Sequence, residues 1–227
     1  TGHAGQRLAL NLSGVEKSQV RRGDWLLDEA VHAPTRRIDA RLRLLPSEAK
    51  ALVHNTPVHL HLGAEDVNAR VMLLEGSRLE PGQQALVQLE LDRPIGALHA
   101  DRFILRDQSA LRTLGGGVVL DIFPPPTRRR REQRSAALRA MEQATPELAL
   151  EALLTLEPTH GVARREFGIL WNLSADDLAK VEAAVKHRTV GEGAAALWFA
   201  AEQLERYAQR IKEHLEAFHR KSPDSPG

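Results

Sequence analysis

The chain has no cysteine among its 227 residues. That absence excludes a disulfide framework and a cysteine-based zinc site, and it favours an intracellular protein. The chain also lacks a strong net charge of one sign, because its 31 lysines and arginines are nearly balanced by 30 aspartates and glutamates. Any binding of nucleic acid must therefore come from local basic patches. No stretch approaches the roughly 20 apolar residues that cross a bilayer, and no signal peptide is recognisable.

Catalytic patterns are also missing. The spacing of the residues allows no Ser-His-Asp or Cys-His arrangement, and the sequence has no phosphate-binding G-x-x-x-x-G-K-[ST] loop. Asp176 and Asp177 are adjacent carboxylates at a predicted helix start, where the helix dipole accounts for them. His59 and His61 share one strand face, but no third metal ligand is near, and alternation explains both as outward polar residues. We therefore predict no enzyme, no cofactor and no metal in this chain.

A period of two runs through residues 6–122. Apolar residues alternate with polar ones in "QRLALNL", in "VHLHL" and in "ALVQLEL", while glycine, proline and asparagine occupy the connections. Such alternation is typical of strands with one buried face. No ten-residue helical pattern interrupts them, so we predict antiparallel β structure, a barrel or a sandwich.

The period changes after "FPPPTRRRRE", residues 123–132, which we interpret as a stiff linker between two separately folding units. Thr145-Pro146 and Ser174 are predicted helix caps, and 174–188 and 201–218 have helical stripes of apolar residues. "GEGAAALWF" offers a turn and a short strand. Helices followed by a small β-wing within about 70 residues predict an α/β winged-helix domain.

Two basic or glycine-rich features could contact phosphate. Gly115-Gly116-Gly117 lies between strand-like segments, so it indicates either close packing at a barrel corner or backbone approach to a polynucleotide. Arg128 to Arg131 form a dense charge run, which is either a solvated linker or a set of phosphate contacts. The helix expected at 174–188 has no net charge, which disfavours sequence-specific reading of DNA.

Several longer motifs resemble one protein family. "AGQRLALNLSGVEKSQVRRGDWL", residues 4–26, resembles the end of the second domain of elongation factor Tu-class GTPases. "RFILRDQSALRTLGGGVVLD", residues 102–121, is similar to the third-domain segment of that class, with its glycine-rich turn and closing strand. Within the class, a proline linker followed by winged helices resembles the bacterial selenocysteine-specific elongation factor (SelB) family.

The resemblance implies a multidomain chain with translation-factor β-barrels. Residues 1–31 would be the last strands of the domain II barrel, 32–126 the domain III barrel, 127–200 a linker with a winged helix, and 201–227 a helix leading to another winged helix. The GTPase domain, with its GTP and Mg, and the mRNA-binding winged helices of the family would lie outside this internal fragment. It would therefore neither hydrolyse GTP nor recognise the mRNA hairpin.

The implied function is that of the tRNA-binding and connecting section of a cytoplasmic, monomeric factor. Its partners would be selenocysteinyl-tRNA and the ribosome, with the selenoprotein mRNA hairpin bound through other domains and no membrane contact. The residues implied to face the tRNA backbone are Arg106, Arg112, Thr113, Gly115 and Gly116. Further candidate RNA phosphate contacts are Arg128, Arg129, Arg130 and Arg131. Two alternatives remain, a rigid spacer between a GTPase core and an mRNA-binding end, and a winged-helix regulator.

Overall fold

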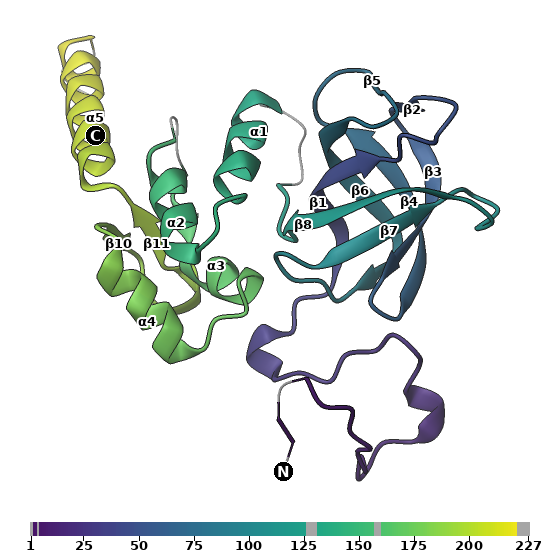
Figure 1. The fold of residues 1–227 in the computed structure, drawn as a ribbon. Coiled ribbons are helices and arrows are strands. Elements are labelled where there is room, and N and C mark those ends of the chain that lie inside the picture. Colours follow the sequence, from purple (N-terminus) through teal and green to yellow (C-terminus); the bar gives the residue numbers. More distant parts are fainter. Residues whose placement is uncertain (1, 4, 126–130, 157–159, 222–227) are drawn as a thin grey trace.

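The computed structural model describes residues 2–3, 5–125, 131–156 and 160–221, with the side chains of 131 and 221 left aside. Along the chain it has an N-terminal segment, a β-barrel and a helical unit with a small sheet, and α5 extends from the helical unit at the C-terminal end (Figure 1).

The N-terminal segment differs from its prediction. Residues 5–34 hold two short 3-10 helices, η1 (Lys17–Gln19) and η2 (Glu29–Val31), and no strand. Leu8 and Leu10 are 54% and 60% exposed. A strand needs a neighbour to take its backbone hydrogen bonds, and no described strand pairs with this segment. The strand predicted for "QRLALNL" is therefore wrong for this structure.

Six antiparallel strands close into a barrel within residues 35–121, all of which are described. Their order is β1-β6-β4-β3-β7-β8. They are β1 (Thr35–Leu44), β3 (Thr56–Leu62), β4 (Glu65–Leu73), β6 (Gln84–Ile95), β7 (Arg102–Arg106) and β8 (Thr113–Asp121). The short strands β2 (Leu52–Val53) and β5 (Arg78–Leu79) pair beside it. The predicted antiparallel barrel is confirmed.

The alternation in the sequence sets the inside and the outside of the barrel. Val58, Leu60 and Leu62 of β3 are buried, whereas His59 and His61 between them are partly exposed. The same rule places Phe103 and Leu105 of β7 inside. A closed sheet has no free edge, so burying one face of each strand is enough to form a continuous core.

The helical unit contains five helices and one sheet among its described residues. The helices are α1 (Arg131–Ala140), α2 (Pro146–Leu154), α3 (Arg164–Leu170), α4 (Ala175–Ala184) and α5 (Ala201–Lys221), and η3 (Gly193–Ala195) is a short turn. The strands are β9 (Val162–Ala163), β10 (Arg188–Val190) and β11 (Leu197–Phe199), in the order β10-β11-β9.

Both predicted helix caps of this unit are confirmed. The Thr145 and Ser174 side chains accept hydrogen bonds from the backbone N–H groups of Leu148 and Asp177. The helix expected at 174–188 ends earlier, at Ala184, because the chain becomes extended at Val185 before it enters β10.

Charged contacts join the helical unit to the barrel. Arg134 of α1 donates through Nε to Asp39 at 2.5 Å and through Nη2 to Asp121 at 2.7 Å. Arg41 donates to both carboxylate oxygens of Glu142 at 2.6 and 2.7 Å. The side chain of Asp39 is fully buried, and burial raises its pKa because the charged form loses its water.

Aromatic and backbone contacts continue this interface. The His99 ring stacks on Trp171 with 3.8 Å between ring centroids, and its Nε2 donates to the backbone oxygen of Met141 at 2.8 Å. Buried apolar residues of barrel and helices form one cluster that includes Ile122 and Leu138. The two units thus share one apolar cluster, which the composition of the linker did not indicate, and their separate folding stays a prediction.

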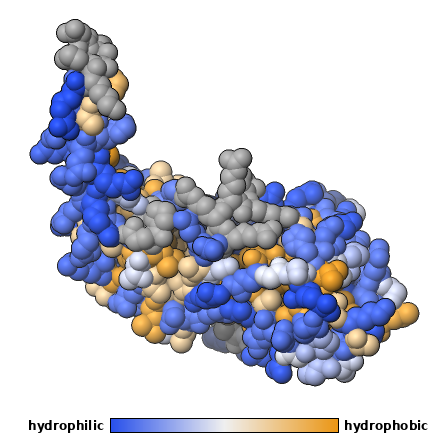
Figure 2. Space-filling model, turned by 90° about the horizontal axis from the view of Figure 1, so that it is seen from above, coloured by the Kyte–Doolittle hydropathy of each residue, from blue (hydrophilic) through white to orange (hydrophobic). Residues whose placement is uncertain are grey.

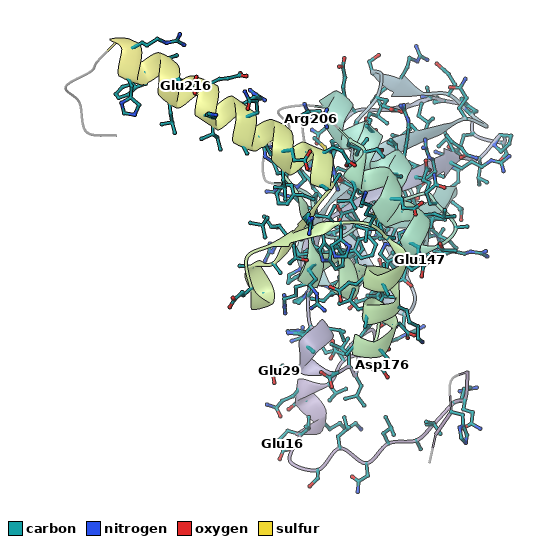
Figure 3. The ribbon with its side chains drawn as sticks, turned by 90° about the vertical axis from the view of Figure 1, so that its left-hand side faces the viewer. Glu16, Glu29, Glu147, Asp176, Arg206 and Glu216 are labelled. Atoms are coloured by element: carbon teal, nitrogen blue, oxygen red, sulfur yellow. The ribbon has the colours of Figure 1, made fainter. Side chains whose placement is uncertain are left out.

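The last helix points away from the rest of the molecule. Figure 3 shows Arg206 near its start and Glu216 toward its far end, well beyond the other helices. Ile211, Leu215 and Phe218 are 59%, 46% and 41% exposed. Figure 2 shows hydrophilic residues over most of this projecting helix and hydrophobic ones mainly on the body. The apolar stripe predicted for 201–218 is thus present, but most of it is uncovered. No helix among the described residues combines the length and the apolar character needed to cross a membrane.

Candidate nucleic-acid interface

The loop from 107 to 112 joins β7 to β8 and is built around one carboxylate. Asp107 Oδ1 accepts hydrogen bonds from the backbone N–H of Leu111 at 2.9 Å, from that of Arg112 at 3.2 Å and from the Ser109 hydroxyl at 3.0 Å. These donors, the Arg112 N–H foremost, lower the pKa of Asp107 because they stabilise its charged form. Ala110 adopts a positive φ of 54°, which closes the turn. The loop is therefore held in one shape before anything binds.

This loop displays an apolar side chain next to a cation. Leu111 is 82% exposed, and the side chain of Arg112 is 60% exposed. Arg112 Nη2 lies 3.5 Å from a carboxylate oxygen of Glu48, which is 7% exposed. An exposed guanidinium steadied on one side by a carboxylate can still donate outward to a phosphate.

The outer face of β7 and β8 continues the positive charge of the loop. Arg102 and Ile104 point outward, since Phe103 between them is buried, and Ile104 is 50% exposed. On the other side of β8, Arg43 pairs with Gly116 and is exposed. The sequences of β7 and of β8 up to Leu120 contain no acidic residue. The result is a basic face, defined here by the side chains of Arg43, Arg102, Arg106 and Arg112.

The glycine-rich turn implied by the resemblance is not formed. Gly115, Gly116 and Gly117 lie inside β8, paired with β1 on one side and with β7 on the other. In such a central strand, successive residues bond to the two neighbours in turn, so the glycine N–H groups serve the sheet. The expected mechanism, in which these N–H groups reach phosphates, lacks free donors.

Close packing explains the three glycines instead. A Cβ on Gly115 would come within 2.3 Å of the Arg43 oxygen, and one on Gly117 within 2.0 Å of the Arg41 oxygen. A Cβ on Gly116 would lie 2.6 Å from the Phe103 oxygen. The strands approach too closely here for any side chain. Of the two interpretations of this run, the structure supports packing at the barrel wall.

Five of the predicted site residues lie together in the structure. Arg106, Arg112, Thr113, Gly115 and Gly116 all belong to the β7–β8 hairpin. Arg106 Nε is buried and has no hydrogen-bond partner among the described residues. Arg128, Arg129 and Arg130 lie outside the described residues, and Arg131 is described only as the first residue of α1.

Sequence reasoning missed one residue at this site. His59 was weighed only as a metal ligand or an outward polar residue, yet its ring lies against the β7–β8 loop. The described residues contain no cluster of three or more residues suited to hold a metal. His59 comes close to this loop because β3 pairs with β7, and the sequence alone does not indicate that pairing.

An open cavity of about 1280 Å³ lies elsewhere in the molecule. Its lining comes from the N-terminal segment, from the end of β6 and the residues after it, and from the start of α4, and it includes Trp25, Ile95 and Leu173. Nothing in the sequence patterns predicted it, because it depends on how distant segments meet.

Comparison with known proteins points to one family. Residues 31–126 match the family model described as "Selenocysteine-specific elongation factor, beta-barrel domain". A selenocysteine-specific elongation factor of Desulfomicrobium baculatum is 29% identical over 99% of this chain and 36% of its own length. That of Escherichia coli (strain K12) is 29% identical over 100% of this chain and 34% of its own length. That of Haemophilus influenzae is 35% identical over 53% of this chain and 19% of its own length.

These matches agree with the observed fold. The family model spans all six strands of the closed barrel, and the two long alignments continue through the helical unit. The chain spans about a third of the length of these two relatives. The barrel of residues 31–126 thus matches the β-barrel domain of selenocysteine-specific elongation factors, and the chain as a whole is similar to those factors.

Proposed function

We propose that this chain is the tRNA-binding and connecting section of a selenocysteine-specific elongation factor that delivers selenocysteinyl-tRNA to the ribosome. The observation that carries the proposal is the basic face of the barrel. Three of its four arginines belong to the β7–β8 hairpin, whose strands have no acidic residue before Asp121, and the fourth, Arg43, lies on the neighbouring β1; all are within the domain that matches the family model. Other partners of the family, such as an mRNA hairpin, GTP and Mg, would be bound by other parts of a longer protein.

The chemistry of the basic face suits the backbone of an RNA helix. Guanidinium groups bind phosphates with paired donors, and double-stranded RNA is recognised through its shape and backbone more than through its bases. Arg106 precedes the loop and Arg112 is its last residue, and Thr113 is exposed beside them. Gly116 lies between Arg43 and Ile104 in the sheet and has no side chain, so an RNA backbone could approach the sheet closely at this position. The glycines act by being small, and the arginines provide the phosphate contacts.

We further propose that the helical unit is a winged helix with a connecting role. Helices α2, α3 and α4 followed by the β10–β11 hairpin fit that layout. Its α4 is a poor reader of DNA, because Lys180 pairs with Asp177, and Glu182 with Arg164. The two acidic residues in its first turn would also repel a phosphate backbone. This disfavours a winged-helix regulator.

The exposed leucines of the N-terminal segment support its assignment to the end of a preceding barrel. Leu8, Leu10 and Leu12 keep the spacing of a strand but have no strand beside them here. Strands from another part of a longer factor would pair with this segment and cover these side chains.

A second candidate function is that of a rigid spacer. The observation in its favour is the interface in which Arg134 joins α1 to Asp39 and Asp121 of the barrel. Because this interface joins the helical unit directly to the barrel, a displacement of the barrel would move α5 as well and would not be absorbed by a flexible linker. This role and tRNA binding are compatible.

Binding of an RNA hairpin that mimics the acceptor and T stems of the tRNA tests the first proposal. We expect the Arg112→Ala variant to bind roughly tenfold more weakly, the scale of one hydrogen bond to a charged group. Arg70→Ala is the matched control, because Arg70 is exposed on β4, which lies opposite β8 in the order of the six strands. Equal losses in both variants, or none in Arg112→Ala, would refute a dedicated RNA face.

A further inference from the structure

His59 occupies an outward position of β3 at the foot of the β7–β8 loop. In the register of the barrel it lies opposite Arg106 of β7 and opposite Asn68 of β4. Its Nε2 is 3.1 Å from the backbone oxygen of Gln108, the second residue of the loop. Its Nδ1 is 3.3 Å from Oδ1 of Asp66. One imidazole thus bridges the loop and strand β4.

Both neighbours of this ring are hydrogen-bond acceptors. A backbone carbonyl oxygen only accepts, and so does an ionised carboxylate. A neutral imidazole has one N–H group and can satisfy only one of them, whereas an imidazolium has two and satisfies both. The geometry around the ring of His59 therefore fits the cation.

We propose that His59, as an imidazolium, is a positioning residue that anchors the β7–β8 loop so that Arg112 and Leu111 are presented to an RNA backbone. This inference rests on the proposed RNA-binding function of the basic face. His59 acts through the loop: its proton holds the carbonyl of Gln108, and the loop in turn fixes the direction of Arg112.

The loop has anchors on both sides. Asp107 fixes its interior, and Glu48 approaches Arg112 from the β1 side of the barrel. His59 provides the anchor on the β3 side. Losing it would free the first half of the loop while the Asp107 hydrogen bonds remain.

The charged groups nearest this ring come from two strands and the loop. Asp66 on β4 is 57% exposed and lies against Nδ1, and Asp107 belongs to the loop whose Gln108 oxygen the ring contacts. Arg106 of β7 is the register partner of His59. His61 also approaches Asp66, with its Nε2 at 4.0 Å from Oδ1. His61 makes no contact with the loop among the hydrogen bonds of the described residues, which makes it a natural control.

The first test concerns the loop itself and needs no RNA. Nitrogen NMR of the ¹⁵N-labelled chain should show both ring nitrogens of His59 protonated at about pH 6, within the range in which histidines change charge. Amide hydrogen exchange in residues 108–110 should rise roughly three- to tenfold in His59→Gln, since a charge-assisted bond to the loop is lost. The same exchange should stay unchanged in His61→Gln. A singly protonated His59 ring at pH 6, or unchanged loop exchange in His59→Gln, would overturn the proposal.

The second test measures binding of the RNA hairpin between about pH 6 and pH 8. The affinity of the parent chain should fall roughly three- to tenfold as the pH rises, while that of His59→Gln should be low and flat. Asp66→Asn, which removes the carboxylate facing Nδ1, is a second variant in case His59→Gln folds poorly, and it should bind the RNA more weakly than the parent at about pH 6. If the loop responds to His59 but no variant changes RNA affinity, the RNA role of the loop fails and the proposed function with it. If the parent and His59→Gln bind RNA with the same pH profile while Arg112→Ala binds weakly, the His59 proposal alone fails.

Discussion

Arg134 of α1 and Asp39 of β1 are 95 positions apart in the chain, yet the Arg134 Nε donates to Oδ2 of Asp39 at 2.5 Å. The carboxylate is fully buried, and its other oxygen accepts from the Gln88 side-chain amide at 2.8 Å. Removing one member of such a buried pair leaves the other uncompensated, which is far more costly than losing a surface ion pair. This contact is therefore the place to test how firmly the helical unit is attached to the barrel.

We expect Arg134→Met to lower the free energy of unfolding by about 3 kcal/mol or more, because Asp39 would remain buried without its cation. Urea unfolding followed by circular dichroism measures it. The control is Arg139→Ala, since Arg139 is exposed and its pairing with Glu75 lies at the surface; its cost should stay within about 1 kcal/mol. The double variant Arg134→Met, Asp39→Leu should recover part of the loss. Similar small costs for Arg134→Met and Arg139→Ala would mean that the interface is not held by this pair.

Gly117→Ala should destabilise the barrel by several kcal/mol, about 3 or more, because its Cβ would meet both the Arg41 backbone oxygen at 2.0 Å and the Phe103 ring at 2.7 Å. Gly63→Ala is the comparison. Gly63 has a φ of 58° but open space around it, so its substitution should cost only about 1 kcal/mol of backbone strain. Thermal unfolding of both variants separates close packing from backbone strain. A Gly117→Ala barrel as stable as the parent would contradict the packing explanation of the glycine run.

The stability of the chain should fall in mild acid through His99. Burial lowers the pKa of His99 from the ordinary value of 6.5, so the folded state resists protonation more than the unfolded state does. Its contribution is therefore complete above about pH 6.5 and is lost as the pH falls toward the lower folded pKa. We expect the difference in unfolding free energy between the parent and His99→Gln to shrink between pH 7 and pH 5.5. A difference that is constant across this range would show that His99 titrates alike in both states.

The salt dependence of RNA binding should identify phosphate contacts on the basic face. Each arginine that neutralises a phosphate releases about one counterion, and it therefore makes the slope of log affinity against log salt concentration steeper by roughly one. Arg102→Ala and Arg112→Ala should each flatten that slope, whereas Leu111→Ala should weaken binding, if at all, without changing it. Fluorescence anisotropy titrations at several salt concentrations give these slopes. Unchanged slopes in both arginine variants would place the phosphate contacts elsewhere.

Some features of this protein could be read directly from the sequence. The alternation of Leu60 and Leu62 with His61 fixed the inside and outside of β3, and Thr145-Pro146 marked the start of α2. Both signals are local, since side-chain direction in a strand and the satisfaction of the first N–H groups of a helix depend on only a few neighbouring residues. The family motifs in residues 102–121 likewise indicated the barrel.

Other features were decided only by the tertiary structure. Leu8 and Leu10 have the alternation of a strand but form none here, because a strand exists only with a partner. The role of Gly117 depends on the Arg41 backbone oxygen of another strand, and the charge balance of Asp39 depends on Arg134 of a helix. His59 meets Gln108 through the pairing of β3 with β7. Local periodicity determines which way a side chain points, whereas the closure of the barrel and the packing of α1 on it determine what that side chain meets.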